Sequence, residues 1–181
     1  MRAMVAFSPR RQRLTCLVLT GVAGVGKTSV MAALGERLDW PAIEGDSLHP
    51  TANVLKMAAG IPLDDVDRWP WLEEVGRWIG DREAERTNSI MTCSALRRRY
   101  RDSLRRGHPL VWFVQLVAPR AVLAQRIEDR TGHFMPASLL PSQLDTLEPL
   151  TPDEPGWVMD ATPAPDVVAD RIIEALRLHP G

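Results

Sequence analysis

The sequence predicts an α/β fold in which a parallel β-sheet is covered on both faces by helices. Five short apolar runs alternate with segments whose apolar residues are three and four positions apart, the spacing of a helix. The first apolar run leads directly into a glycine-rich turn. This alternation implies right-handed crossovers and predicts that ligands bind at the carboxyl ends of the strands.

Each element follows from its own pattern. Residues 14–20 form a continuous apolar and β-branched run, which is typical of a strand buried on both faces. Pro119 and Pro165 stand where the first turn of a helix tolerates proline. The remaining strands are expected at 42–44, 89–93, 110–117 and 157–159, and helices at 27–38, 94–106, 119–130 and 165–178. Five prolines between 136 and 155 predict a lid or a long connection.

Composition indicates one globular domain, which we expect to span residues 14–181. The chain has 181 residues, 45% hydrophobic and 25% charged, and its formal net charge of -1 argues against nucleic acid as a main partner. The apolar run at 14–19 is too short for a membrane span or an export signal. Residues 1–13 are expected to form a mobile tail. Cys16 and Cys93 lie in expected strands without metal-site spacing, which favours a reducing, cytoplasmic location.

A phosphate-binding loop is the strongest motif. The segment Gly21-Val22-Ala23-Gly24-Val25-Gly26-Lys27-Thr28 matches GxxxxGK[ST] between an expected strand and an expected helix. Its glycines let main-chain N–H groups converge on phosphates, and the helix N-terminus favours negative charge. We expect Lys27 to reach the β- and γ-phosphates and the Thr28 hydroxyl to bind Mg²⁺. The expected nucleotide-binding residues here are Gly21, Ala23, Gly24, Val25, Gly26, Lys27, Thr28 and Ser29.

Two residues outside the loop are candidates for acceptor chemistry. Asp46 follows the second expected strand, where a carboxylate could orient or deprotonate a hydroxyl for phosphoryl transfer; the alternative is a helix cap or turn residue. Of the 22 Lys and Arg residues only Lys27 and Lys56 are lysines, so Lys56 is a candidate for a second function, with an exposed helix lysine as the alternative. The charged stretch around Lys56 predicts a polar substrate pocket. For the individual acidic residues of this stretch, a position on the solvated surface is the alternative.

One long run gives a family resemblance. The segment His49-Pro50-x-x-Asn53-x-x-Lys56-Met57-x-x-Gly60-x-Pro62-Leu63-x-Asp65-x-Asp67-Arg68-x-Pro70-Trp71-Leu72 resembles the signature of the gluconokinases, ATP-dependent kinases that make 6-phosphogluconate. Further blocks that resemble this family are Cys93-Ser94-Ala95-Leu96-Arg97-Arg98-Arg99-Tyr100-Arg101-Asp102, Gly132-His133-Phe134-Met135-Pro136, Ser142-Gln143 and Thr146-Leu147-Glu148-Pro149.

The resemblance implies a P-loop kinase fold similar to adenylate kinase, with a five-stranded parallel sheet and a mobile lid at about 131–155. It implies ATP and Mg²⁺ as cofactors, D-gluconate as the substrate and a homodimer. Asp46 would hold the hydroxyl that is phosphorylated, and Arg126 and Arg130 would act with Lys27 on the ATP phosphates. The substrate-binding residues would be Asp46, His49, Lys56, Arg68, Ser94, Arg97, His133 and Gln143, and Thr162 and Pro163 would border the adenine.

The chain also departs from the family pattern. Arg97 and Thr131 stand where a lysine is common in the family, which puts substrate affinity at Arg97 and any catalytic role for residue 131 in doubt. Two alternatives remain at this point. The chain could phosphorylate another small acceptor, such as shikimate or a nucleoside monophosphate, or it could be a nucleotide-binding regulator without catalysis.

Overall fold

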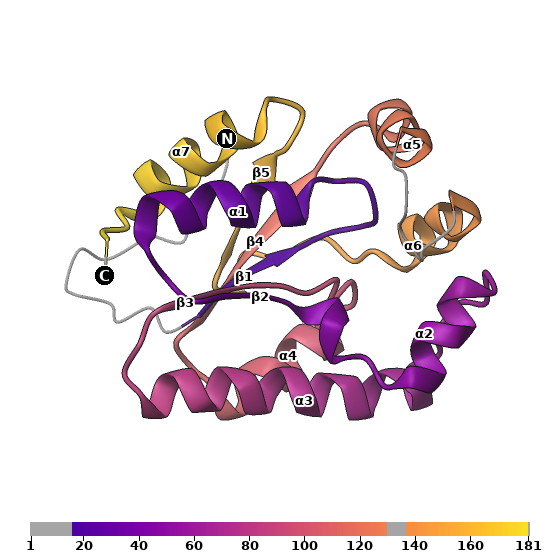
Figure 1. The fold of residues 1–181 in the computed structure, drawn as a ribbon, viewed down its shortest axis with the longest axis horizontal. Helices are drawn as coiled ribbons and strands as arrows, with labels where there is room; N and C mark the ends of the chain where they lie inside the picture. Colours follow the sequence, from indigo (N-terminus) through magenta and orange to yellow (C-terminus); the bar gives the residue numbers. More distant parts are fainter. Residues whose placement is uncertain (1–15, 130–136, 181) are drawn as a thin grey trace.

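A parallel five-stranded sheet forms the centre of the computed structural model, which describes residues 16–129 and 137–180. The strand order is β2-β3-β1-β4-β5, and every neighbouring pair is parallel (Figure 1). The strands are β1 Cys16–Thr20, β2 Ala42–Glu44, β3 Ser89–Thr92, β4 Val111–Val117 and β5 Gly156–Asp160. The order confirms the expected parallel α/β architecture.

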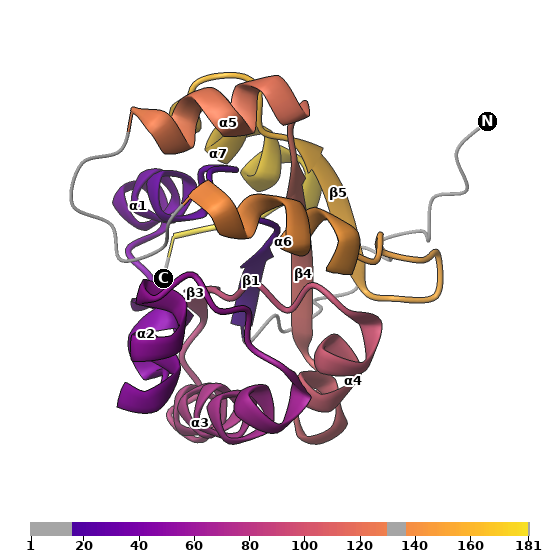
Figure 2. The same cartoon turned by 90° about the vertical axis from the view of Figure 1, so that its right-hand side faces the viewer.

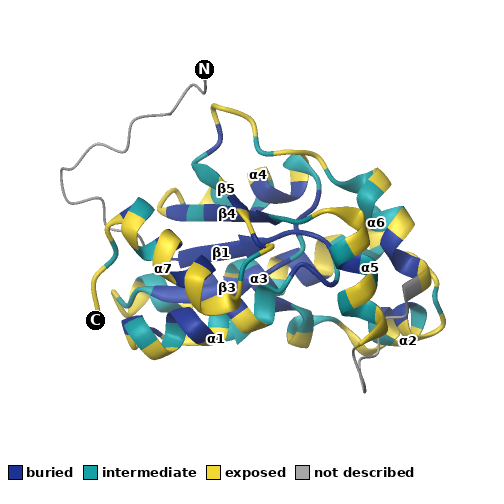
Figure 3. Ribbon diagram, turned by 90° about the horizontal axis from the view of Figure 1, so that it is seen from above, coloured by how far each residue is buried: buried dark blue, intermediate teal, exposed yellow. Residues whose placement is uncertain are grey.

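The central strand β1 shows why both faces must be covered. All five of its residues are buried, and alternate side chains enter two different clusters. Leu17 and Leu19 belong to one cluster, whereas Cys16 and Val18 belong to the other. Seen from above, the strand ribbons β1, β3 and β4 are largely dark blue between exposed helix surfaces (Figure 3). The apolar run without alternating polar residues therefore forms a strand that is buried on both faces.

Two layers of helices cover the sheet (Figure 1). On one face α1 and α7 pack against each other and against the sheet, and Leu123 of α5 joins the same cluster. On the opposite face α3 and α4 supply Trp71, Val75, Tyr100 and other side chains. The bounds are α1 Lys27–Leu38, α3 Asp65–Ala84, α4 Arg98–Gly107, α5 Arg120–Glu128 and α7 Pro165–Leu176.

Short helical elements gather at one end of the molecule, beyond the carboxyl ends of the strands. They are the 3-10 helix η1 Gly45–Leu48, α2 Thr51–Ala58, the 3-10 helix η2 Ala137–Leu139 and α6 Leu140–Thr146. Figure 2 looks onto this end, with α5, α6 and α2 in front of the strands. Leu139 packs with Met57 and Leu63, so the segment that carries α6 contacts the α2 side of the molecule. These short helices therefore cover the carboxyl ends of the strands, where the sequence predicts that ligands bind.

Some boundaries differ from the sequence expectation. Helix α4 begins at Arg98 and not at residue 94, because Ala95 adopts a left-handed conformation (φ 32°) and Arg97 is extended. The 20-residue helix α3 was not assigned from the sequence. Its N-terminus is a capping box, in which Asp64 accepts from the Asp67 N–H and Asp67 accepts from the Asp64 N–H.

Within the described ranges, no helix combines the length and the hydrophobicity that a membrane span requires. The expected tail at 1–13 lies outside the described residues, as does part of the expected lid.

Candidate active site

The phosphate-binding loop connects β1 to α1 and passes close to neighbouring main chain. Gly21 has φ 137°, and a Cβ there would lie 2.7 Å from the carbonyl oxygen of Leu116. Gly24 has φ 78°, and a Cβ there would lie 2.7 Å from Ile127. Both positions therefore require glycine for conformation and for space. The loop is fixed between β4 and α5, with the start of α1 directly after it.

Two side chains interact with the loop. Lys27 donates from Nζ to the carbonyl oxygens of Gly21 and Val22, at 2.9 and 3.0 Å, so its charge is held over the loop. Gln143 of α6 accepts a hydrogen bond of 2.7 Å from the main-chain N–H of Ala23. The carboxamide oxygen of Gln143 therefore accepts from one of the loop N–H groups that the sequence analysis expects to bind phosphate. Helix α6 reaches the donor side of the site through this contact.

A pocket of about 250 Å³ lies beside the loop. Its lining residues are Gly24, Val25, Gly26, Ser29, Val30, Arg126, Ala161, Pro163 and Pro165. Arg126 donates to the carbonyl oxygens of Val25 (3.2 Å) and Thr162 (3.1 Å), and so bridges the loop and the turn after β5. Ser29, Arg126 and Pro163 therefore lie together as expected for a nucleotide site, while Thr162 contributes its carbonyl group to Arg126.

Asp46 lies in η1, directly after β2. Gly45 before it has no room for a side chain, because a Cβ would lie 2.3 Å from the carbonyl oxygen of Thr92 at the end of β3. The indole N–H of Trp71 donates to the Gly45 carbonyl at 2.7 Å. These two contacts hold η1 against the end of β3. The Asp46 side chain remains 30% exposed and is therefore accessible to a ligand.

His49 lies behind Asp46 with its ring almost fully buried. The ring stacks on Trp71 with centroids 4.2 Å apart, and its Nε2 lies 4.0 Å from Oδ1 of Asp46. The pKa of His49 is lowered to about 4, mainly by burial; the Asp46 carboxylate acts in the opposite direction, and Arg68 acts in the same direction as burial. The ring is therefore neutral at neutral pH. Asn53 of α2 donates toward Nδ1 at 3.3 Å.

Lys56 is paired with a carboxylate. Its Nζ lies 2.5 Å from Oδ1 of Asp67, and this hydrogen bond raises the pKa of Lys56 and lowers that of Asp67. The lysine side chain is 42% exposed, so the pair borders solvent. Asp67 also caps α3 and, through its carbonyl oxygen, accepts from Asn53 at 2.8 Å. One acidic residue thus connects α2 to α3 next to His49.

A second pocket, of about 370 Å³, lies on the acceptor side. Its lining residues are Leu63, Asp64, Asp65, Val66, Arg68, Arg97, Tyr100 and Thr146. Arg68 lies over the ring of Tyr100 (5.6 Å) and donates from Nε to the carbonyl oxygen of Leu63 (3.3 Å). Arg97 lies 3.9 Å from Asp65, which also pairs with Arg99 at 2.5 Å and accepts from the Tyr100 hydroxyl. Two arginines therefore border one pocket that could take an anionic ligand.

Three charged residues lie near enough to Cys93, which directly follows β3, to affect the pKa of its thiol. Burial raises the pKa of the Cys93 thiol; the negative charge of Asp46 raises it too, whereas Lys27 and Arg68 act in the opposite direction. Cys93 is fully buried and is not itself a reactive group. The loop lysine, the candidate acid and the pocket arginine are therefore all near enough to the end of β3 to act on this buried thiol. The structure thus brings together residues that are 19 to 41 positions apart in sequence.

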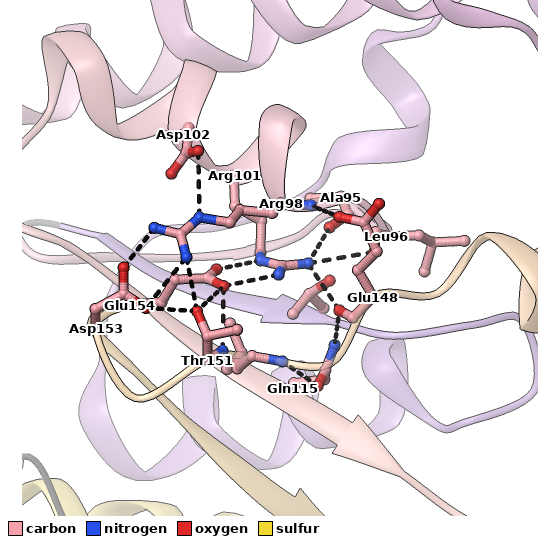
Figure 4. A network of polar contacts seen from close by, with 12 residues as sticks. Ala95, Leu96, Arg98, Arg101, Asp102, Gln115, Glu148, Thr151, Asp153 and Glu154 are labelled. Atoms are coloured by element: carbon pink, nitrogen blue, oxygen red, sulfur yellow. Dashed lines mark hydrogen bonds and ion pairs between the residues drawn. The ribbon is translucent and has the colours of Figure 1, made fainter.

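A buried polar network holds the segments that carry Arg97 and α6 (Figure 4). Arg101 pairs with Glu154 through Nε (2.5 Å) and Nη2 (2.9 Å), and donates to the carbonyl oxygens of Ala95, Leu96 and Glu148. The Glu148 carboxylate in turn accepts from the N–H of Arg98 at 2.6 Å, at the start of α4. The chain after α6 is thereby fixed to the chain before α4.

Comparison with known proteins identifies the family. No family model matches the chain. A gluconokinase from Gluconobacter oxydans (strain 621H) is 47% identical over 157 residues, covering 87% of this chain and 88% of the relative. The chain belongs to the gluconokinase family. The crystal structure of a gluconokinase from Sinorhizobium meliloti 1021 is 42% identical with a TM-score of 0.81, and covers 92% of this chain and 94% of that chain.

A second solved structure of similar sequence agrees with the gluconokinase family fold. An unliganded sugar kinase from Janibacter sp. HTCC2649 is 43% identical with a TM-score of 0.87, and covers 92% of this chain and 96% of that chain. The P-loop kinase fold expected from the phosphate loop and the gluconokinase blocks is therefore confirmed.

Not every residue expected from the gluconokinase resemblance has a described position. Arg130 and His133 lie outside the described residues, as does Thr131. Ser94 lies between β3 and α4, where its carbonyl oxygen accepts from the Thr20 hydroxyl. Sequence reasoning included Asn53 in the resembling run but gave it no role; its place four residues after His49 could have suggested contact between the two side chains.

Proposed function

We propose that this chain transfers the γ-phosphoryl group of ATP to a hydroxyl of D-gluconate, giving 6-phospho-D-gluconate. The observation that carries the proposal is the placement of Lys27 on the loop after β1 and of Asp46 in η1 against the end of β3, the strand next to β1, in a chain of the gluconokinase family. A cation on the donor side and a carboxylate on the acceptor side are the two groups that in-line phosphoryl transfer to a hydroxyl requires.

The donor half of the reaction uses the loop between β1 and α1. Its N–H groups and Lys27 bind the phosphates, and the 250 Å³ pocket next to Arg126 and Pro163 holds the adenine. Thr28, in the first turn of α1, offers a hydroxyl oxygen, which suits a hard cation that binds mainly through ATP phosphates. Mg²⁺ bound there would neutralise phosphate charge.

The acceptor half uses the residues around Asp46. The carboxylate orients the gluconate hydroxyl and takes its proton, while His49 and Lys56 form hydrogen bonds to hydroxyls of gluconate. Arg68 and Arg97, which border the 370 Å³ pocket, bind the gluconate carboxylate, because a guanidinium can donate two parallel hydrogen bonds to it. Gln143, which accepts from the Ala23 N–H in this structure, would bind gluconate once the ATP phosphates take that N–H.

The experiment is a coupled assay of ADP release from MgATP with D-gluconate, shikimate, AMP or no acceptor. Release only with gluconate is expected. The variant Asp46→Asn should lose about 10²- to 10⁴-fold in turnover while ATP affinity is kept, because only the proton acceptor is removed. The same change at exposed Asp81 on α3 is the control. Release with another acceptor, or unchanged turnover in Asp46→Asn, contradicts the assignment.

We further propose a cytoplasmic homodimer. The family resemblance supports both points, and the two buried thiols, Cys16 and Cys93, are compatible with a reducing compartment. Size-exclusion chromatography with light scattering tests the assembly, with a mass near twice 20.2 kDa expected and a mass near 20.2 kDa contradicting it.

A further inference from the structure

A chain of hydrogen bonds runs from the main chain of α3 to the ring of His49. The Nδ2 group of Asn53 donates to the carbonyl oxygen of Asp67 at 2.8 Å, and the same Nδ2 lies 3.3 Å from Nδ1 of His49. A carbonyl oxygen only accepts hydrogen bonds, so the contact with Asp67 fixes which end of the Asn53 amide carries hydrogens. The second amide hydrogen therefore points at the histidine ring.

This arrangement determines the tautomer of His49. Because Nδ1 accepts from Asn53, the ring hydrogen of the neutral imidazole must be on Nε2. That nitrogen lies 4.0 Å from Oδ1 of Asp46, too far for a direct hydrogen bond. An oxygen atom placed about 2.8 Å from both would fill the gap, at ordinary hydrogen-bonding distances. A hydroxyl there would accept from Nε2 and donate to the carboxylate.

The surroundings keep the ring in this state. Its side chain is 3% exposed and stacks on Trp71. The charged groups that act on it are Asp46 on η1 and Arg68 on α3, with opposite effects on the pKa, and burial is the largest cause of its value of about 4. The Lys56–Asp67 pair lies beyond Asn53. A second proton would also put an N–H at Nδ1 against the Asn53 amide hydrogens.

We propose that Asn53 is a positioning residue which, by donating to Nδ1, keeps the Nε2 hydrogen of His49 directed at the acceptor hydroxyl held by Asp46. The catalytic use of this arrangement rests on the proposed function, but the tautomer itself does not. His49 then acts as a fixed hydrogen-bond donor to the hydroxyl oxygen. The proton leaves toward Asp46, and the second oxygen lone pair stays available for attack on phosphorus.

The first test is NMR of the ¹⁵N-labelled imidazole groups of the wild-type protein, with His49 assigned by loss of its signals in His49→Gln. We expect the neutral Nε2–H tautomer from pH 8 down to pH 5.5. Titration near the ordinary value of about 6.5, or an Nδ1–H tautomer, would overturn the proposal. This readout needs no phosphoryl transfer, so it distinguishes failure of the positioning role from failure of the kinase assignment.

The second test reverses the polarity at residue 53. In Asn53→Asp a carboxylate faces Nδ1, accepts its hydrogen and favours the charged ring. Gluconate-dependent kcat/KM should then fall about tenfold between pH 8 and pH 6, as for a group of pKa about 7, while the wild type stays flat. Asn88→Asp, at the only other asparagine of the chain, should keep the wild-type profile.

A double variant separates titration of His49 from damage to the fold. Glutamine at position 49 offers an N–H donor but does not titrate, so Asn53→Asp combined with His49→Gln should lose the acid-side fall. A flat profile in Asn53→Asp alone, or an acid-side fall that persists in the double variant, contradicts the proposal. Should Asn53→Asp not fold, the wild-type NMR result decides.

Discussion

Replacing Glu154 by glutamine tests how much the buried ion pair in Figure 4 contributes to stability. The side chains of Arg101 and Glu154 are 1% and 3% exposed, and two hydrogen bonds join them. The Glu154 carboxylate also accepts from the N–H and the hydroxyl of Thr151. Glutamine has nearly the same shape but no charge, so the guanidinium would stay buried without its counter-charge.

The expected loss of stability in Glu154→Gln is large relative to the total free energy of unfolding. Breaking a buried ion pair from one side costs about 3–5 kcal/mol, out of a total stability of about 5–15 kcal/mol for a domain. For a chain of this size each kcal/mol lowers Tm by about 2–4 °C, so Glu154→Gln should melt about 6–20 °C below the wild type. A loss of this size should also be visible as a lower urea midpoint with an unchanged slope.

Circular dichroism melts of three proteins provide the assay: wild type, Glu154→Gln and Asp153→Asn. The control removes the neighbouring carboxylate, which pairs with Arg98 at 2.5 Å but is 63% exposed. Water screens that pair, so its loss should shift Tm several-fold less. Equal shifts in the two variants would refute the argument that burial makes the Arg101 pair important.

The pH dependence gives a second check on the same carboxylate. Burial raises the pKa of Glu154, but hydrogen bonds from Arg101 and Thr151 outweigh burial, and the net pKa in the folded state is lowered. A lowered folded-state pKa stabilises the protein above the ordinary glutamate pKa, and that contribution is lost as pH falls through the folded-state value. The difference in unfolding free energy between wild type and Glu154→Gln should therefore shrink in acid.

Three further predictions concern the site. Arg68→Lys should raise KM for gluconate by about tenfold with little change in KM for ATP, because a lysine cannot donate two parallel hydrogen bonds to a carboxylate. Steady-state kinetics measures both constants, and an equal change in the two KM values would contradict the prediction. Gln143→Ala should leave the Ala23 N–H open and so tighten ATP binding without gluconate, as calorimetry would measure; weaker binding would contradict it. Gly45→Ala should destabilise the fold by about 1–3 kcal/mol because its Cβ meets the carbonyl oxygen at the end of β3, whereas Gly35→Ala, with open space in α1, should be neutral or stabilising in thermal melts.

The elements that could be predicted from sequence are those with a local signal. The phosphate loop has fixed spacing, and the strand at 16–20 has an unbroken apolar run, so both follow from neighbouring residues. Helix α3 was missed because Pro70 lies inside it and charged residues dominate its start. Its capping box, Asp64 with Asp67 three residues later, was a usable signal. Pro70 lies in the second turn, and the helix continues through it because tertiary packing of Trp71 and Val75 compensates.

The residues of the candidate site could be predicted from the sequence, but the hydrogen bonds and ion pairs among them could not. Lys27 and Asp46 were selected from position and residue type and Arg68 from the family resemblance, and in the fold all three lie near enough to Cys93 to affect its pKa. That Lys56 pairs with Asp67 depends on how α2 packs beside α3, which no local pattern encodes. The same holds for Gln143, which reaches a loop 120 residues earlier in the chain.

The buried Arg101 side chain serves main-chain hydrogen bonding as well as the ion pair with Glu154. The carbonyl groups of Ala95, Leu96 and Glu148 lie outside regular secondary structure, and one guanidinium donates to all three. An apolar pair of the same volume would remove this donor from all three carbonyl groups, of which that of Leu96 also accepts from the Glu148 N–H and that of Glu148 also accepts from Gln115. Arg97 directly follows the first of these segments, and α6 directly precedes the second. The geometry of the acceptor pocket therefore depends on Arg101, a residue that does not line it.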